Sequence, residues 1–420
     1  MGTDPTATWH RRDLAHRVCR ALLVGERVLR FLGETGYRDD EDLEDSFGPD
    51  KPFAETAMLL HVAAGVRGFP DLSNRVAGLT DALARRARAP RTACAIALHP
   101  SIALQLAMPH VLLTGLGHPD ARFDEVLGLS MQSSGAHGRE VVPHRMLERM
   151  WIISLWTRTE PGPDFDVVAR HSVLNHPLDL IWGAREDAYA HTHTFMYFTN
   201  FGYSHRELPR ARTDVLAESG VLLARSLLLG DFDLAGEVLM AWPLTGEPWS
   251  PAATFGFRVL AELEDRVGFL PAKNGTPAKF IDLVAAERTK YALASSYHTA
   301  YVMGMLCALA LRADDPLPTT FTGRTVPHTV IDDLLAIIGE RDAPWRVTFD
   351  RLSGDEQRRL GSLLLDMALL ASSRSNDYAT VASLLERAVH HGLAGSPLCA
   401  QAAQLLHRVV VGARVSESVG

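Results

Sequence analysis

Cysteine and lysine are both scarce in this sequence, and the two scarcities bear on its cellular compartment and on its binding partners. The four cysteines in 420 residues stand far apart and form no Cys-x-x-Cys pair, which favours reduced thiols in a cytoplasmic protein over a disulfide framework. Lysine occurs only four times among 42 basic residues, and the net charge is −8. We therefore expect neither a nucleic-acid partner nor an anionic membrane surface. No apolar signal segment opens the chain.

Long hydrophobic runs free of helix breakers are also missing. The longest uncharged run, residues 92–119, has the length of a membrane span. Pro100, Pro109 and three histidines interrupt it, so we expect a buried helical hairpin there and no span. The short motifs of phosphate-binding loops, dinucleotide sites, serine hydrolases and zinc proteases are absent as well.

The sequence has helical periodicity almost throughout and no sustained alternation, which predicts an all-α fold. Proline and glycine fall near the ends of the periodic segments, so the connections should be short. The expected helices cover approximately residues 10–32, 54–66, 73–89, 93–99, 101–116, 122–130, 141–157, 165–172, 178–200, 208–229, 232–242, 251–267, 278–291, 293–311, 328–339, 354–373, 377–391 and 397–412.

Three segments carry no formal charge: residues 92–119, 188–205 and 291–311. A helix that is apolar on all sides is buried on all sides, whereas its charged neighbours have one wet face. Inner helices surrounded by outer ones indicate an α/α toroid or a closely related layered array of helical hairpins. An irregular helical domain is the alternative. We expect residues 1–90 to form a helical segment packed on a core of residues 91–420.

Two motifs carry a resemblance to known proteins. Residues 189–202 (YAHTHTFMYFTNFG) and 296–302 (SYHTAYV) resemble a family of proteins of unassigned function from high-GC bacteria. Residues 263–271 (LEDRVGFLP) resemble the turn between layers in α/α-toroid enzymes, a group that includes terpenoid cyclases, protein prenyltransferases and lanthionine cyclases. The resemblance covers roughly residues 90–320 and implies a fold, not a reaction. The acidic tetrad of triterpene cyclases and the cysteine–histidine zinc set of lanthionine cyclases are both missing.

Candidate functional side chains gather in residues 186–202. Read as a helix, this segment places Glu186, Tyr189, His193, Tyr197 and Asn200 on one stripe. We expect His193 and His298 to move protons and a buried Glu186 to orient or tune an imidazole. The alternative is a structural role, in which these histidines only link core helices by hydrogen bonds. The expected substrate-binding residues are Tyr189, Tyr197, Asn200, Phe198, Tyr301 and His110.

Cofactor binding is not expected. His191 and His193 resemble a metal-binding pair, but on a helix their rings point apart. A divalent metal ion held by His193, His298 and Glu186 is the alternative. The acidic run at residues 39–45 is expected to be a solvated loop.

These observations predict a cytoplasmic biosynthetic enzyme of bacterial specialised metabolism, with a homodimer compatible with the sequence. Its reaction would be cyclisation, isomerisation or elimination on an apolar or peptidyl intermediate, by acid/base chemistry in a helical cavity. The alternative is a non-catalytic helical module that binds a peptide, a carrier protein or an apolar ligand. A carbohydrate-active barrel would need paired carboxylates, for which the sequence offers Glu186 and Asp187.

Overall fold

The computed structural model describes residues 10–38, 46–138, 142–271, 281, 283–313 and 321–419, and the expected acidic loop at 39–45 lies outside them. Within the described residues the regular structure is helical, apart from one isolated bridge between Tyr37 and Phe47. The all-α prediction is thereby confirmed for this part of the chain. No single described helix has both the length and the apolar character to cross a membrane. Pro90–Leu98 and Pro100–Gly115 meet that criterion only together, and they are bent by 110°.

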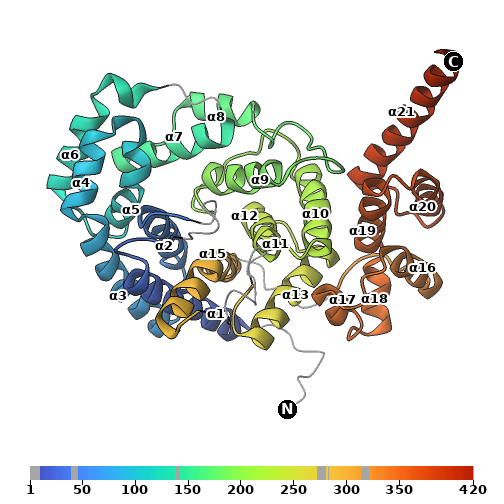
Figure 1. Ribbon diagram of the computed structural model, residues 1–420, viewed down its shortest axis with the longest axis horizontal. Helices are drawn as coiled ribbons and strands as arrows, with labels where there is room; N and C mark the ends of the chain where they lie inside the picture. The colour runs from blue at the N-terminus through green and yellow to red at the C-terminus, as the bar shows by residue number, and fades with distance from the viewer. Residues whose placement is uncertain are drawn as a thin grey trace.

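The helices follow one another along the chain with short connections (Figure 1). The first part contains α1 (Arg11–Phe31), α2 (Asp50–Ala63), α3 (Pro70–Ala87), α4 (Pro90–Leu98), η2 (Pro100–Ile102), α5 (Ala103–Gly115), α6 (Ala121–Met131), η3 (Ser134–His137), α7 (Pro143–Thr157), α8 (Pro163–Arg170) and α9 (Arg185–Phe198). The second part contains α10 (Arg212–Leu228), α11 (Phe232–Leu239), α12 (Ala241–Thr245), α13 (Pro251–Val267), α15 (Ala285–Arg312), α16 (His328–Ile338), α17 (Pro344–Phe349), α18 (Gly354–Arg359), α19 (Gly361–Arg374), α20 (Tyr378–His390) and α21 (Pro397–Val419).

Six helices contact one another in a closed circuit. Helix α2 packs against α5, α5 against α7, α7 against α9, α9 against α11, α11 against α15, and α15 returns to α2. Other helices lie against this circuit: α1 and α3 on one side of it, α8 on α7, and α10 and α13 on α11 (Figure 1). We call the six helices α2, α5, α7, α9, α11 and α15 the circuit.

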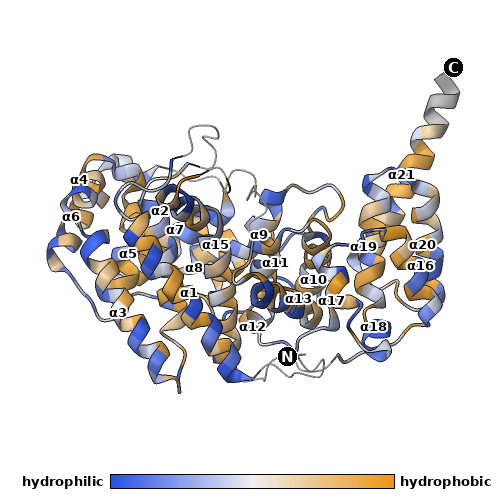
Figure 2. Ribbon diagram, turned by 60° about the horizontal axis from the view of Figure 1, so that its bottom comes forward, coloured by the Kyte–Doolittle hydropathy of each residue, from blue (hydrophilic) through white to orange (hydrophobic). Residues whose placement is uncertain are grey.

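Composition distinguishes α15, in the circuit, from α1, which packs against it. Helix α15 has no charged residue from Tyr291 to Leu311 and is buried without interruption from Tyr301 to Leu311. Helix α1 is amphipathic and buries Leu14, Val18 and Leu22 on one face. Figure 2 shows patches of blue and orange that alternate along α1 and α3. The uncharged length of α15 is therefore mostly buried and α1 covers it with one face, whereas α2, α7, α9 and α11 of the circuit carry charged residues.

The C-terminal helices form their own packing group. Helix α19 contacts α16, α20 and α21, and the group meets the remainder of the chain through α10 and α13. Figure 1 places this group on the right, with α21 extending away from the body. The circuit and its cavity lie in the other part of the molecule.

Several helix boundaries differ from those expected. Helix α15 is one continuous helix where two were expected at 278–291 and 293–311; residues 278–280 and 282 lie outside the described part. Helix α9 begins at Arg185 and not at residue 178, because the Asp179 side chain accepts hydrogen bonds from the amides of Ile181 and Trp182 in a turn. The expected helix 354–373 breaks at Leu360 into α18 and α19.

Candidate functional site

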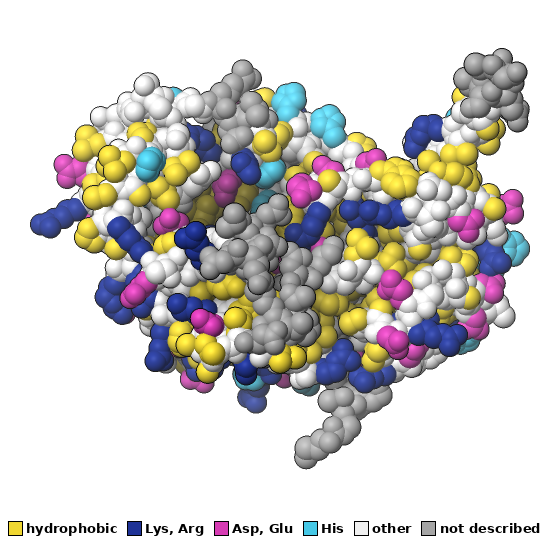
Figure 3. Space-filling model, viewed as in Figure 1, with side chains coloured by type: hydrophobic (Ala, Val, Ile, Leu, Met, Phe, Trp, Pro, Cys, Tyr) yellow, Lys and Arg dark blue, Asp and Glu magenta, His cyan; other side chains and the backbone are white. Residues whose placement is uncertain are grey.

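A cavity of about 840 Å³ opens at the end of the circuit where several of its helices begin. Because the amino end of a helix carries a partial positive charge, this end favours negatively charged side chains and ligands. Figure 3, seen from the same side as Figure 1, shows acidic and histidine side chains near the centre of the molecule, between the positions of α2 and α9. The polar residues lining the cavity include Lys51, Glu55, His144, Arg185, Glu186, Tyr189, His193, Asp233 and His298.

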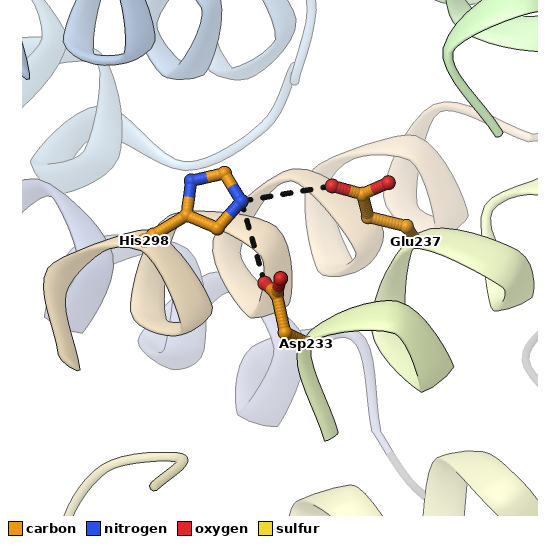
Figure 4. A group of neighbouring side chains, drawn as sticks. All are labelled: Asp233, Glu237 and His298. Carbon is orange, nitrogen blue, oxygen red and sulfur yellow. Dashed lines mark ion pairs between the residues drawn. The ribbon is translucent and has the colours of Figure 1, made fainter. Parts of the chain in front are cut away.

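Three side chains from two helices meet beside this cavity, and two of them, Asp233 and His298, line it (Figure 4). Asp233 and Glu237 are one helical turn apart on α11, so both project from the same face. His298, on α15, directs its Nε2 atom between them, 3.4 Å from Asp233 Oδ1 and 3.6 Å from Glu237 Oε1. Its other ring nitrogen points away from both carboxylates.

Two further ionisable side chains complete the group. Glu55 on α2 places Oε2 3.3 Å from His298 Nδ1. His193 on α9 places Nε2 3.6 Å from Glu237 Oε2. Four helices of the circuit therefore contribute to one group, which we call the carboxylate–histidine cluster: Glu55, His193, Asp233, Glu237 and His298.

Neighbouring side chains hold the acids of the cluster in place. The Tyr189 hydroxyl donates a hydrogen bond of 2.6 Å to Asp233 Oδ2, and the Thr192 hydroxyl donates one of 2.5 Å to Glu237 Oε2. Arg185 makes two hydrogen bonds to Asp231, lies 3.6 Å from Asp233 Oδ2 and covers the Tyr189 ring. Helix α9 thus fixes the orientation of both acids on α11.

The two acids on α11 are more deeply buried than the two imidazoles. The side chains of Glu237 and Asp233 are 2% and 9% exposed, whereas those of His193 and His298 are 34% and 35% exposed. The acids lie at the base of the cluster and the rings face the cavity. Two buried carboxylate oxygens, Glu55 Oε2 and Asp233 Oδ1, accept no hydrogen bond from the described residues.

Burial and opposite charge act against each other in the cluster. Burial opposes the charged form of His298, yet Asp233 and Glu55 raise the pKa of its imidazole well above the usual value. Burial likewise lowers the pKa of His193, but Glu237 and a second nearby carboxylate together outweigh this effect, so the pKa is raised overall. Burial would raise the pKa of Glu55 and Glu237, but the neighbouring histidines lower both. For Asp233 burial prevails, and its pKa is raised. The cluster strongly favours a positive charge at the position of His298.

The structure divides the expected stripe on α9. Tyr189 and His193 face the cavity, and Tyr197 lies against His193 with its hydroxyl donating to Glu148. Asn200 leaves the stripe because the chain turns left-handed after α9, with φ of 46° at Asn200 and 50° at Phe201. Its side chain accepts a hydrogen bond of 2.7 Å from Trp151 and pairs with His61, outside the cavity.

Other expected site residues lie elsewhere. Glu186 is exposed on the cavity rim, so the expectation that it is buried is wrong. Phe198 is buried and stacks on Phe165. The Tyr301 hydroxyl pairs with Thr56 in the core. His110 lies between Arg88 and Asp124, outside the lining of this cavity. His191 contacts Ser219 and not the cluster, as the helical geometry of the HxH pair indicated.

Sequence reasoning missed the three carboxylates of the cluster. Glu186 and Asp187 were the only acidic pair offered, for a carbohydrate-active barrel, whereas Glu55 and Asp233 line the cavity and Glu237 lies beside Asp233 on α11. A signal existed in α11, whose sequence FDLAGEVL contains two acids one turn apart among apolar residues. A short helix of this kind has no face that could expose the acids to solvent while its apolar residues are buried, so the acids are buried with them.

Comparison with known proteins gives one match. A family model described as "Domain of unknown function (DUF6895)" matches residues 26–308, more than half of the chain and all five residues of the cluster. No curated protein and no solved structure matches the chain.

Proposed function

The chain belongs to the family described as "Domain of unknown function (DUF6895)", and we propose that it is an enzyme whose reaction takes place at the carboxylate–histidine cluster. The observation that carries the proposal is the gathering of five ionisable side chains from four helices at the base of one cavity. Removing three carboxylates from water destabilises a fold unless each is paired, and apolar residues would fill the same space at lower cost. Such arrangements are concentrated at functional sites.

The proposed architecture is an α/α toroid with the circuit as its inner layer. Contacts at the far end support it: Asn200 beyond α9 pairs with His61 on α2, and Arg312 on α15 donates to the Phe201 carbonyl. Helices α2, α9 and α15 therefore run in one direction away from the cavity. Arg11 at the start of α1 donates to the carbonyl of Leu311 at the end of α15, so α1 runs the opposite way. Parallel inner helices with antiparallel outer neighbours are the winding of a toroid.

An aromatic wall supports a substrate that is apolar or aromatic over part of its length. The rings of Tyr37 and Tyr291 lie 6.3 Å apart, those of Tyr37 and Phe47 6.1 Å, and those of Phe47 and Tyr297 5.7 Å. All four residues line the cavity. A cavity with one apolar wall and a few convergent polar groups is the usual form of a small-molecule site.

The reaction we propose is a cyclisation, isomerisation or elimination in which His193 transfers a proton to or from the substrate. Its ring is open to the cavity, and one nitrogen lies near Glu237. His298 differs, because carboxylates face both of its nitrogens, and we assign it to organising the cluster. Proton transfer requires a group within hydrogen-bond reach of the substrate, and His193 meets that condition for a ligand in this cavity.

Untargeted metabolite profiling tests this proposal without a known substrate. Purified wild-type protein is incubated with a small-molecule extract, and compounds consumed or formed are followed by mass spectrometry. We expect at least one conversion, reduced by roughly 100-fold or more in His193→Gln. His171→Gln, which changes an exposed histidine outside the cavity, should keep it. If wild type and His193→Gln retain the same compound equally and leave it unchanged, the chain is a binding module and not an enzyme.

A further inference from the structure

We infer that Asp233 Oδ1, Glu237 Oε1 and His298 Nε2 bind one divalent transition-metal ion at the base of the cavity. The inference rests on the proposed site but not on its reaction, since metal binding is measurable without turnover. The three atoms lie within 4.8 Å of one another, and the imidazole nitrogen is 3.4 Å and 3.6 Å from the two oxygens. Ligands bonded to one ion at about 2.0–2.2 Å lie roughly 3–4 Å apart, so small side-chain movements admit the ion.

The outward oxygens of the two acids have hydrogen-bond donors, and the outward nitrogen of His298 faces a carboxylate oxygen. Tyr189 donates to Asp233 Oδ2, Thr192 donates to Glu237 Oε2, and Glu55 Oε2 faces His298 Nδ1 at 3.3 Å. Metal-binding histidines usually donate their second nitrogen to a carboxylate, and metal-binding carboxylates are usually hydrogen-bonded in turn. Each acid thus has one oxygen held by a hydrogen bond, and all three side chains direct one atom at a common point (Figure 4).

Asp233 gives independent support for a ligand at that point. Its side chain is more than nine-tenths buried, yet Oδ1 accepts no hydrogen bond from the described residues. A buried carboxylate oxygen without a donor is destabilising, and native structures rarely keep one. His298 Nε2, 3.4 Å from Oδ1, offsets this cost by charge only while its imidazole is protonated, whereas a metal ion that displaces the proton bonds to both atoms. The partial positive charge at the start of α11 does not replace it, because that charge is spread over the backbone amides.

The donor set selects the kind of metal. One imidazole nitrogen with two carboxylate oxygens suits Mn²⁺, Fe²⁺ or Zn²⁺ better than Ca²⁺ or Mg²⁺, which prefer oxygen ligands alone. Three protein ligands leave positions open on the side of the ion that faces the cavity. An ion there would polarise an oxygen atom of a bound substrate, next to the His193 ring.

Metal titration of untagged protein tests the inference. The protein is freed of metal with a chelator and titrated by calorimetry with Mn²⁺ and Zn²⁺, and bound metal is counted by elemental analysis. We expect one ion per wild-type chain and a loss of affinity of about 100-fold or more in Asp233→Asn and Glu237→Gln. Asp332→Asn, an exposed aspartate on α16, is the matched control and should bind like wild type. Thr192→Val keeps all three ligands and should lose roughly 10-fold.

A second measurement guards against unfolded variants. Circular dichroism checks their helix content, and wild-type Tm should rise with the logarithm of metal concentration while that of Asp233→Asn does not. In Co²⁺-loaded protein, His298→Gln should shift the visible absorption bands because a nitrogen ligand is lost. Equal affinity in wild type, Asp233→Asn and Glu237→Gln, or no stoichiometric ion in wild type, overturns the inference. Turnover that persists in chelator and still depends on His193 would leave the proposed function intact and show that the bound ion takes no part in the reaction.

Discussion

At the scale of single residues, the decisive feature is how the protein compensates buried carboxylates. Glu237 is almost fully enclosed, and its two oxygens face His298 on one side and His193 with Thr192 on the other. Asp233 has Tyr189 and Arg185 on one oxygen and His298 opposite the other. Each acid is therefore paired on its outward side and left open toward the same point. The metal site that we propose rests on that asymmetry, which a salt bridge that only joins helices does not need.

Tyr189→Phe tests this compensation. The change removes the hydroxyl that donates to Asp233 Oδ2 but keeps the ring that packs under Arg185. We expect the free energy of unfolding to fall by about 1–3 kcal/mol, because a buried carboxylate loses a donor. Urea unfolding followed by circular dichroism measures it. Tyr378→Phe, whose hydroxyl bonds to Asn376 at the surface, is the control and should change stability by less than about 0.5 kcal/mol. Equal effects of the two changes would contradict the role given to Tyr189.

At the scale of elements, the absence of charge in a segment predicted burial better than its helical periodicity did. The uncharged segments 188–205 and 291–311 indicated buried helices, and α9 and α15 are indeed part of the circuit. The two segments also bring His193 and His298 to one cavity. The end of α9 could not be foreseen in the same way, because consecutive left-handed residues at Asn200 and Phe201 depend on contacts with α2 and α7.

The acids of the cluster escaped prediction for a different reason. The predicted site residues lie mostly in segments without charge, whereas Asp233 and Glu237 are the only charged residues of α11. Their partner His298 lies on another helix, and which helices meet is decided by tertiary packing. Local pattern can show that α11 buries two acids, but not what those acids face.

The contact between α19 and α21 has a pH dependence of its own. Burial raises the pKa of Asp366 on α19 to about 7, although the Ser396 hydroxyl donates to it. The folded protein therefore holds this carboxyl neutral where the unfolded chain would ionise it. Its contribution to stability is fully present below about pH 4, declines as the pH rises, and is lost above about pH 7.

Asp366→Asn isolates this effect. The amide keeps the size of the carboxyl group and carries no charge, so the variant should be more stable than wild type at pH 8 by on the order of 3 kcal/mol. At pH 4 the two proteins should differ little. Denaturant unfolding at both pH values measures the difference. A variant that is less stable than wild type at pH 8 would contradict the account of Asp366.

At the scale of the whole molecule, the site depends on the closure of the circuit. Glu55 comes from α2, His193 from α9, the two acids from α11 and His298 from α15. Helix α1 makes the most extensive helix contact in the described chain, with α15, and so supports the helix that closes the circuit. The two helices approach closely at Gly304, where an added Cβ would lie 2.4 Å from Ala21 Cβ.

Gly304→Ala tests the importance of that approach. Although alanine favours helices, we expect the change to lower the free energy of unfolding by about 1–3 kcal/mol, because α1 and α15 must move apart. Gly220→Ala on α10 is the matched control: nothing lies within 4 Å of its added Cβ. It should raise stability by roughly 0.5–1 kcal/mol through helix propensity. Thermal unfolding of both variants gives the answer, and a stabilising Gly304→Ala would show that the α1–α15 contact is loose.

The most direct measurement is anomalous diffraction from a crystal of the protein soaked in Mn²⁺ or Zn²⁺. We predict one strong peak at the base of the cavity, about 2.0–2.3 Å from Asp233 Oδ1, Glu237 Oε1 and His298 Nε2. The peak should vanish in Asp233→Asn. No peak at this position, or a peak bound only by other residues, would contradict the claim that the carboxylate–histidine cluster is a metal-binding functional centre.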